Sequence, residues 1–358
     1  MNRIKRKLHG SATKLVSTLC LSVGLLVLGG IAHAVEINGI NDPARDAYYN
    51  AFKDKKVVFV PVFMGLPLTE GWSKAMQLQA DRLGYHYEVR NANFDTSAGT
   101  QILTSLIKGK DKPDVIVVHN PDVTSYKRLE QEAEKAGIYV IQMNMKSLAT
   151  TTGFAGGDAT RIAEMEAKAV VDQCGAGTDT SHKVLILTGP TTAPWSVYLN
   201  QGYKNVFTKE SGVNVVSIQS DGNYSADKEK QITNITLQQH PDLCAVVSVW
   251  DVAAVGAAAA IEQAGKKDQV FLATNGGGGK SVGCRNIEND NFDYYVSFDV
   301  PGQGRDINNL IEMALEQKAA GIKPGTTKTL LYSKLTVLNK QNIHAPGSTA
   351  CWTVKDMH

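Results

Sequence analysis

The sequence predicts an α/β protein built from two doubly wound parallel-sheet lobes. Continuous runs of Val, Ile and Leu alternate with stretches whose apolar residues recur at helical spacing, which is typical of buried parallel strands covered by helices on both faces. The pattern runs to about Gly153 and then restarts. A chain of 358 residues is long enough for two domains, each with its own core.

Each half of the chain alternates strand and helix patterns. The first half, after a polar lead-in to about Lys56, predicts strands over 57–62, 85–90, 113–118 and 138–143. Apolar spacing predicts helices over 70–83, 97–107 and 125–136, with Thr96 as the cap of the second. The second half predicts helices over 161–174, 197–210, 228–239, 252–264 and 303–318, and strands over 184–188, 213–217, 245–249, 270–273 and 297–302.

The N-terminus has the features of a secretory signal peptide. Residues 1–14 carry five bases and no acid, and an apolar run follows from Leu15 to Ile31. The run ends at Ala32-His33-Ala34, a small-residue pattern typical of cleavage after Ala34. The alternative is a membrane anchor, but the run is short for a span of about 20 residues and ends in a cleavage pattern. We therefore expect an exported, periplasmic protein with a signal peptide over 1–34.

The net charge of the expected mature chain excludes some partners. Loss of the leader takes five of the 37 Lys and Arg and leaves 32 against 35 Asp and Glu, a net charge of −3. A mildly acidic exported protein has no electrostatic basis for binding nucleic acid or an anionic membrane. We expect a monomer.

Four cysteines remain after such a cleavage: Cys174, Cys244, Cys284 and Cys351. An even number in an oxidising compartment predicts two disulfides, and four cysteines allow three pairings. Their separations of 70, 40 and 67 residues are unlike the close spacing of metal-binding cysteines, so we expect no metal site.

Side chains that follow the strands are the candidates for a binding site. Ligands of open parallel α/β sheets bind outside the carboxyl ends of the strands. Trp72, Trp195 and Trp250 lie at such positions, together with amides and carboxylates. Aromatic rings stack on the C–H faces of sugars and polyols, while Asn and Asp pair with their hydroxyls. The alternative is that each tryptophan is a core residue, but three at strand ends favour a site.

Other motifs do not indicate catalysis. The run Asn275–Ser281 resembles a phosphate loop, but Thr274 stands where that motif requires Gly. We interpret its glycines as a turn that lets a ligand or a lobe approach closely. The sequence has no H-E-x-x-H motif. We expect no enzyme activity, no catalytic residues and no cofactor.

Several short segments, in order and spacing, resemble the periplasmic sugar-binding proteins of the ribose/galactose type, which serve ABC transporters. These proteins share the type I periplasmic binding fold with the ligand domains of lactose-repressor-like regulators. The similarity covers about 57–337 and rests on Ala80-Asp81-Arg82-Leu83-Gly84-Tyr85, Pro113-Asp114-Val115-Ile116-Val117, Asn120-Pro121-Asp122, Ala136-Gly137-Ile138-Tyr139-Val140-Ile141, Gln201-Gly202-Tyr203, His240-Pro241-Asp242-Leu243, Trp250-Asp251 and Asp299-Val300-Pro301. A regulator would carry a helix-turn-helix where this chain has a signal peptide.

The resemblance implies two lobes with a ligand cleft between them, joined by three crossover hinge strands. The expected N-terminal lobe comprises 48–153 plus about 301–325. The expected C-terminal lobe comprises 154–300 plus about 326–345, and 346–358 form a tail.

The resemblance also implies a pocket. Carried over by position, its residues are Trp72, Asn120, Asn144, Trp195, Tyr224, Trp250, Asp251, Asn275 and Asp299. Ribose-type members have Asp-Arg where this chain has Asn144-Met145, and an Arg where it has Trp195-Ser196-Val197-Tyr198. They have Asn-Asp in place of Trp250-Asp251 and Asp-Gly in place of Asn275-Gly276. Loss of two Arg clamps and gain of Trp favour a small uncharged polyol or another monosaccharide, with Asp251 ionised and paired to two hydroxyls.

The function that follows is capture of a small neutral sugar or polyol and its delivery to an ABC transporter permease. In this mechanism, an open form binds the ligand and the lobes close around it. One alternative is a periplasmic sensor that presents the closed form to a chemoreceptor or a sensor kinase. Another is an exported α/β enzyme, which a turnover assay would distinguish.

The positions of the cysteines predict their pairing. Cys174 ends a helix and Cys244 begins a strand in the same half, while Cys284 and Cys351 both lie late in the chain, where a disulfide would fix the tail. We expect the pairs Cys174–Cys244 and Cys284–Cys351.

The maturation of the protein is the first testable prediction. Mass spectrometry of the exported protein should find Val35 at the N-terminus, since the small-residue pattern ends at Ala34. An intact Met1 in a soluble periplasmic fraction would contradict the leader assignment.

Overall fold

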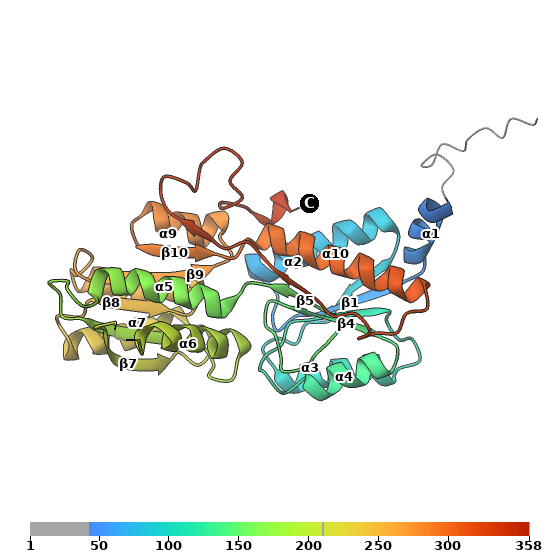
Figure 1. Cartoon of the computed structure of the whole chain (residues 1–358), viewed down its shortest axis with the longest axis horizontal. Helices are drawn as coiled ribbons and strands as arrows, with labels where there is room; N and C mark the ends of the chain where they lie inside the picture. The colour runs from blue at the N-terminus through green and yellow to red at the C-terminus, as the bar shows by residue number, and fades with distance from the viewer. Residues whose placement is uncertain (1–42, 210, 358) are drawn as a thin grey trace, which may run out of the picture. The chain divides into compact units, whose positions relative to one another are not determined.

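The structure is a computed structural model that describes residues 43–209 and 211–357 (Figure 1). The expected signal peptide lies outside the described residues. A helix α1 (Pro43–Phe52) precedes the first strand, and two sheets of six strands follow, both within one compact unit, Ala44–His358. We call each sheet with its covering helices a lobe.

The first lobe contains a wholly parallel sheet. Its strands lie in the order β11 (Thr329–Tyr332), β5 (Gly153–Gly156), β4 (Tyr139–Met143), β3 (Val115–Val118), β1 (Lys56–Val60) and β2 (His86–Val89). Four helices cover it: α2 (Pro67–Leu83), α3 (Thr96–Lys108), α4 (Lys127–Lys135) and α10 (Val300–Ala319).

The alternating side chains of β1 explain how both faces of this sheet are covered. Val57 and Phe59 belong to one apolar cluster, which includes residues of α2 and α10, whereas Val58 and Val60 belong to another, which includes residues of α3 and α4. Successive side chains of a strand point to opposite faces, so a strand that is apolar throughout needs helices on both sides. Figure 1 shows α2 and α10 on one side of the sheet and α3 and α4 on the other.

The second lobe repeats this plan with one difference. Its strands lie in the order β12 (Thr336–Leu338), β10 (Tyr294–Ser297), β9 (Phe271–Gly276), β8 (Ala245–Ser248), β6 (Lys183–Thr188) and β7 (Asn214–Ser220). β12 pairs antiparallel with β10, and the other pairs are parallel. Helices α5 (Ala159–Cys174) and α6 (Pro194–Phe207), α7 (Ala226–Gln239) and α8 (Asp251–Gln263) complete the layers, with a π-helix η1 (Gly279–Cys284) and a short α9 (Arg285–Glu288) after β9. The α/β fold with two doubly wound parallel sheets is therefore confirmed.

The chain passes between the lobes three times, and a small hydrogen-bond network around Gln303 and Asn144 connects the three crossings. The crossings follow β5, β10 and β11. Gln303, at the start of α10 and fully buried, donates from Nε2 to Asn144 Oδ1 at 3.1 Å and to Ser333 Oγ at 3.1 Å. Asn144 Oδ1 also accepts from the backbone of Gly157 at 3.4 Å.

The short strands β5, β11 and β12 that frame these crossings have no clear sequence pattern. β5 and β11 lie in the first sheet, whereas the expected boundaries placed 154–156 and 326–345 in the second lobe.

Two sequence expectations are corrected at helix starts. Asp95, and not Thr96, caps α3, because its carboxylate accepts from the backbone N–H groups of Ser97 and Ala98 at 2.7 and 3.1 Å. The strand expected over 297–302 ends at Ser297, where β10 stops. Asp299 then caps α10 by accepting from Gly302, and Pro301 fits the first turn of a helix, where no N–H donor is needed.

The predicted disulfides are confirmed. Cys174, at the end of α5, bonds to Cys244, next to the start of β8, with Cα atoms 6.0 Å apart. Cys284, at the end of η1, bonds to Cys351 in the C-terminal tail, with Cα atoms 5.6 Å apart.

Within residues 43–209 and 211–357, no helix is both long and apolar enough to span a bilayer.

Removal of the Cys174–Cys244 disulfide should destabilise the second lobe. The bond closes a loop of 70 residues, so the chain-entropy model predicts a loss of roughly 4 kcal/mol in the free energy of unfolding on replacing both cysteines by Ser. Urea denaturation of the oxidised protein measures this. A variant with the wild-type midpoint and slope would contradict the prediction.

Candidate functional site

A small cavity lies where the carboxyl ends of the two sheets meet. Its lining comes from both lobes: Phe63, Leu68, His119, Met145, Trp195, Tyr224 and Trp250. The cavity has a volume of about 20 Å³, which is room for about one water molecule. A second cavity of about 30 Å³ shares Leu68 and Trp250 with it and reaches Asp251, Gly277 and Trp352. The strand ends expected to bind ligand are therefore brought together.

His119, directly after β3, is the most informative polar group in this cavity. The side chain is fully buried, and neither ring nitrogen has a hydrogen-bond partner. Its ring meets Trp72 edge-on at 5.4 Å between centroids and Phe63 at 6.0 Å. Burial lowers the pKa of His119 to about 3, so the imidazole is neutral and offers one donor and one acceptor.

Aromatic rings from both lobes surround this imidazole. Trp250 meets Tyr224 edge-on with centroids 5.8 Å apart and lies 6.2 Å from Phe63 of the first lobe. Tyr224 has a positive φ of 55°. Asp221 holds that turn, because its carboxylate accepts from the backbone N–H groups of Asn223, Tyr224 and Ser225. Two of the predicted site residues therefore form one wall of the cavity.

Trp195 and Asn275 form a hydrogen-bonded support behind that wall. Trp195, at the start of α6, donates from Nε1 to Val249 O at 3.1 Å and to Asn275 Oδ1 at 3.2 Å. Asn275 in turn donates to Glu166 Oε1 at 3.0 Å, and Tyr203 donates to Glu166 Oε2 at 2.5 Å. Burial raises the pKa of Glu166 to about 8, although both hydrogen bonds oppose the shift. Trp195 thus lines the cavity, while Asn275 positions it.

Asn120 is buried next to His119 and belongs to a first-lobe network. Its amide donates to Gln142 Oε1 at 3.1 Å and to Met145 O at 3.0 Å. Glu130 accepts from Ser147 Oγ in the same region, and burial raises the pKa of Glu130 to about 7. The structure places Asn120 as a support for the loop that carries Met145, one of the residues that line the cavity.

Asp251 differs from its expected state. The side chain is buried at the start of α8, and Oδ2 accepts from the Tyr295 hydroxyl at 2.7 Å. Burial raises the pKa of Asp251 to about 7, against the smaller effect of the Tyr295 hydrogen bond. The carboxyl group is therefore partly protonated at neutral pH and already holds a partner. The sequence predicted an ionised carboxylate that pairs with two ligand hydroxyls, whereas Oδ2 of Asp251 already accepts from Tyr295. Tyr295 lies on β10, 44 residues later in the chain.

Trp72, Asn144 and Asp299 lie behind the cavity or at the hinge. Trp72 is fully buried in α2 and donates to Gln303 Oε1 at 3.0 Å, so it supports His119 from behind. Asn144 accepts from Gln303, and Asp299 caps α10 and also accepts from Thr349 Oγ1 at 3.3 Å. Of the nine predicted residues, Trp195, Tyr224 and Trp250 line the central cavity. His119 and Phe63, outside the predicted nine, line it too; each closely follows a strand, which is the signal that could have found them.

The described part of the chain contains no group of three or more His, Cys, Asp or Glu residues that could hold a metal ion. The cavity is lined by aromatic rings, a neutral imidazole and the apolar side chains of Leu68 and Met145, with buried amides behind them. Such a set binds by shape, stacking and hydrogen bonds.

The buried Glu166 predicts that stability falls as pH rises. Its pKa is about 8 in the folded protein against an ordinary value of 4.5, so between these values the folded state holds a proton that the unfolded state has lost. The contribution of Glu166 to the free energy of unfolding is fully present below about pH 4.5. It falls by up to about 1.4 kcal/mol per pH unit as the pH rises to about 8. Glu166→Gln mimics the protonated group and should flatten that slope in urea titrations.

Glu164→Gln is the matched control for this measurement. Hydrogen bonding to Asn205 lowers the pKa of Glu164, so this group stays ionised above pH 4.5 and should leave the slope unchanged. Equal slopes for Glu166→Gln and the wild type would contradict the assignment.

Comparisons with known proteins agree with this architecture. Residues 57–319 match the family model described as "Periplasmic binding protein domain". The D-ribose/D-allose-binding protein of Pseudomonas aeruginosa is 26% identical over 227 residues, which is 61% of this chain and 66% of that protein. The chain thus spans slightly less than two thirds of this relative.

Solved structures share the fold. A carbohydrate transporter solute-binding protein from Agrobacterium radiobacter, in complex with D-arabinose, superposes with a TM-score of 0.71 at 18% identity, over 82% of this chain and 97% of that one. The Caulobacter myo-inositol binding protein bound to myo-inositol gives a TM-score of 0.69 at 17% identity, over 82% and 95%. The matched family model covers most of the two lobes, and the chain therefore belongs to the periplasmic binding protein family.

Proposed function

We propose that this protein is an exported receptor that captures a small neutral sugar or polyol between its lobes and delivers it to the permease of an ABC importer. The observation that carries the proposal is His119, a neutral buried imidazole with two unpartnered nitrogens in a cavity walled by aromatic rings of both lobes. The relatives described above, named for ribose and allose or solved with arabinose and inositol, support the same ligand class.

The chemistry of the cavity suits a polyhydroxy compound. A hydroxyl group both donates and accepts, as does the neutral imidazole of His119. The rings of Phe63, Trp195 and Trp250 offer flat apolar faces to C–H groups. None of the seven lining residues carries a carboxylate, an ammonium or a guanidinium group, so a charged ligand would enter without a counter-charge, which is costly in a buried site.

The size of the cavity indicates that capture requires movement of the lobes. A volume of about 20 Å³ is far below the roughly 300 Å³ at the lower end of small-molecule sites. A ligand could enter only after the sheets' carboxyl ends separate, and the three crossings are the segments about which they would turn. Closure of two lobes around a ligand is a common way to bury it on all sides.

A ligand screen followed by one substitution tests this proposal. Thermal shift of the mature protein with D-ribose, D-allose, D-arabinose and myo-inositol should show a rise in Tm for at least one compound of this class, because binding to the native state alone stabilises it. For that compound, His119→Leu should weaken binding by about tenfold or more, through loss of up to two hydrogen bonds of about 1 kcal/mol each. Calorimetry measures the affinities.

His86→Leu is the control, since His86 is exposed on β2, and it should bind like the wild type. The wild-type affinity should hardly change with salt, because a neutral ligand brings no charge. Affinity that collapses with added salt, or wild-type binding by His119→Leu, would contradict the proposal.

A further inference from the structure

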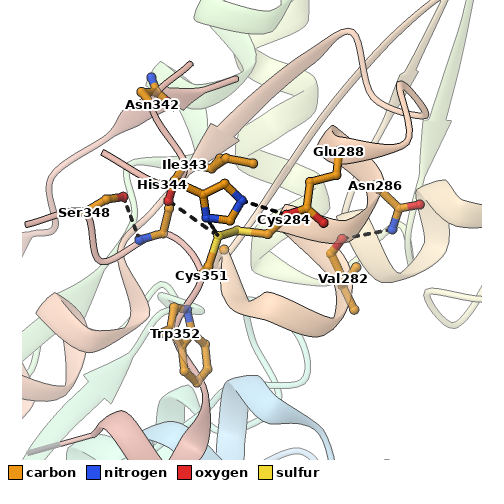
Figure 2. The surroundings of a disulfide bond; sticks show 12 residues. Val282, Cys284, Asn286, Glu288, Asn342, Ile343, His344, Ser348, Cys351 and Trp352 are labelled. Atoms are coloured by element: carbon orange, nitrogen blue, oxygen red, sulfur yellow. Dashed lines mark hydrogen bonds and ion pairs between the residues drawn. A yellow bond between two sulfur atoms is a disulfide. The ribbon is translucent and has the colours of Figure 1, made fainter. Parts of the chain in front are cut away.

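The C-terminal tail is covalently attached to the second lobe. After β12 the chain turns back, and Cys351 forms the disulfide to Cys284 at the end of η1. Figure 2 shows this bond with His344 beside it, whose Nε2 lies 2.8 Å from Glu288 Oε1, and with the Trp352 ring directed away from the sulfur atoms. The tail therefore begins from a fixed point on the second lobe.

Backbone hydrogen bonds on both sides of Cys351 add to this attachment. Gly279 donates to Ala350 O at 2.6 Å, and Lys280 donates to Trp352 O at 3.0 Å. The Trp352 indole donates from Nε1 to Gly277 O at 2.8 Å. Gly278 and Gly279 have positive φ values of 77° and 93°, which glycine adopts at little cost. The backbone of the glycine run at the end of β9 and after it thus forms hydrogen bonds with residues 350–352 of the tail.

The same residues then pack on the first lobe. Trp352 is buried, and a methyl group added at Gly71 of α2 would lie 3.0 Å from its Cζ3 atom and 3.1 Å from its Cη2 atom. The next residues form a 3₁₀ turn, η2 (Val354–Asp356), that contacts α2. Met357 is buried, and a methyl group added at Gly304 of α10 would lie 3.1 Å from its Cε atom. The tail therefore ends against the two helices that cover the first sheet.

These two attachments differ in kind. The second lobe holds the tail by a covalent bond and by hydrogen bonds, and the contact with the first lobe includes apolar packing of Trp352, Val354 and Met357. Apolar contacts are non-directional and can be broken reversibly, whereas the disulfide stays intact when the lobes move. Separation of the lobes would therefore break the contact with α2 and α10 and leave the tail on the second lobe.

We propose that residues 350–357 form a C-terminal strap that holds the lobes in the closed arrangement, with Trp352 as its wedge and the Cys284–Cys351 disulfide as its anchor. The strap closes one side of the cleft, because Trp352 lines the second cavity together with Trp250 and Leu68. It sets how far the ligand-free protein opens, and this inference does not depend on the identity of the ligand.

Distances between the lobes in the ligand-free mature protein test the strap. Spin labels at Lys112→Cys and Asp268→Cys, exposed positions just before β3 and β9, report the distance between the lobes by pulsed electron resonance. The wild type should give one narrow closed population. Trp352→Ala should raise the ratio of open to closed molecules by about fivefold or more, and replacement of Cys284 and Cys351 by Ser should act in the same direction.

Two further variants separate the strap from a general loss of stability. Gly71→Ala leaves every tail atom in place and favours the helix, yet its methyl group would press on Trp352, so it should also open the lobes. Lys355→Ala, on the exposed side of the tail, should match the wild type. A closed distribution in both Trp352→Ala and Gly71→Ala would overturn the proposal; if Trp352→Ala does not fold, Gly71→Ala decides alone.

Discussion

The arrangement of both lobes depends on the buried amide of Gln303. Its oxygen accepts from Trp72 in α2, and its nitrogen donates to Asn144 and Ser333. Asn144 accepts from Gly157 after β5, Ser333 follows β11, and Gln303 itself lies after β10, so this network connects all three crossings. A buried amide with every hydrogen bond made is rigid, since breaking one leaves a polar atom without a partner at a cost of about 1–3 kcal/mol. His119 lies against Trp72, which links the hinge to the cavity.

The sequence predicted the central strands and their covering helices because local patterns determine them. Val57–Val60 and Val115–Val118 are apolar on both faces, a property that belongs to each segment by itself. β5, β11 and β12 could not be predicted in this way, because strands of three or four residues depend on which neighbouring strand the chain meets. The pairing of Cys174 with Cys244 followed from placing each on a predicted element of the same half, and Cys284 was paired with Cys351 because both lie late in the chain. Both arguments need only the order of elements and not their exact positions.

The sequence predicted where several site residues lie, but it predicted less well what each side chain does there. Trp195, Tyr224 and Trp250 follow strands and do line the cavity. Asp251 and Asp299 also lie at strand ends, yet partners distant in sequence bond to their carboxylates, Tyr295 to Asp251 and Thr349 to Asp299. Such partners lie outside any local window of sequence. His119 shows the reverse case, in which a side chain is left without partners, and only the fold reveals that.

The position of β11 makes the two lobes interdependent during folding. The first sheet is completed only when Thr329–Tyr332 pairs with Gly153–Gly156, and strands β6 to β10 of the second sheet lie between these two segments in the chain. Closing so long a loop adds little entropy cost over a shorter one, because that cost grows only with the logarithm of length, but contacts distant in sequence form slowly. One edge of β5 therefore stays unpaired until residues 329–332, within the last 30 of the 358 residues, are available. A truncation that removes 329–358 takes β11 from the first sheet and β12 from the second at once.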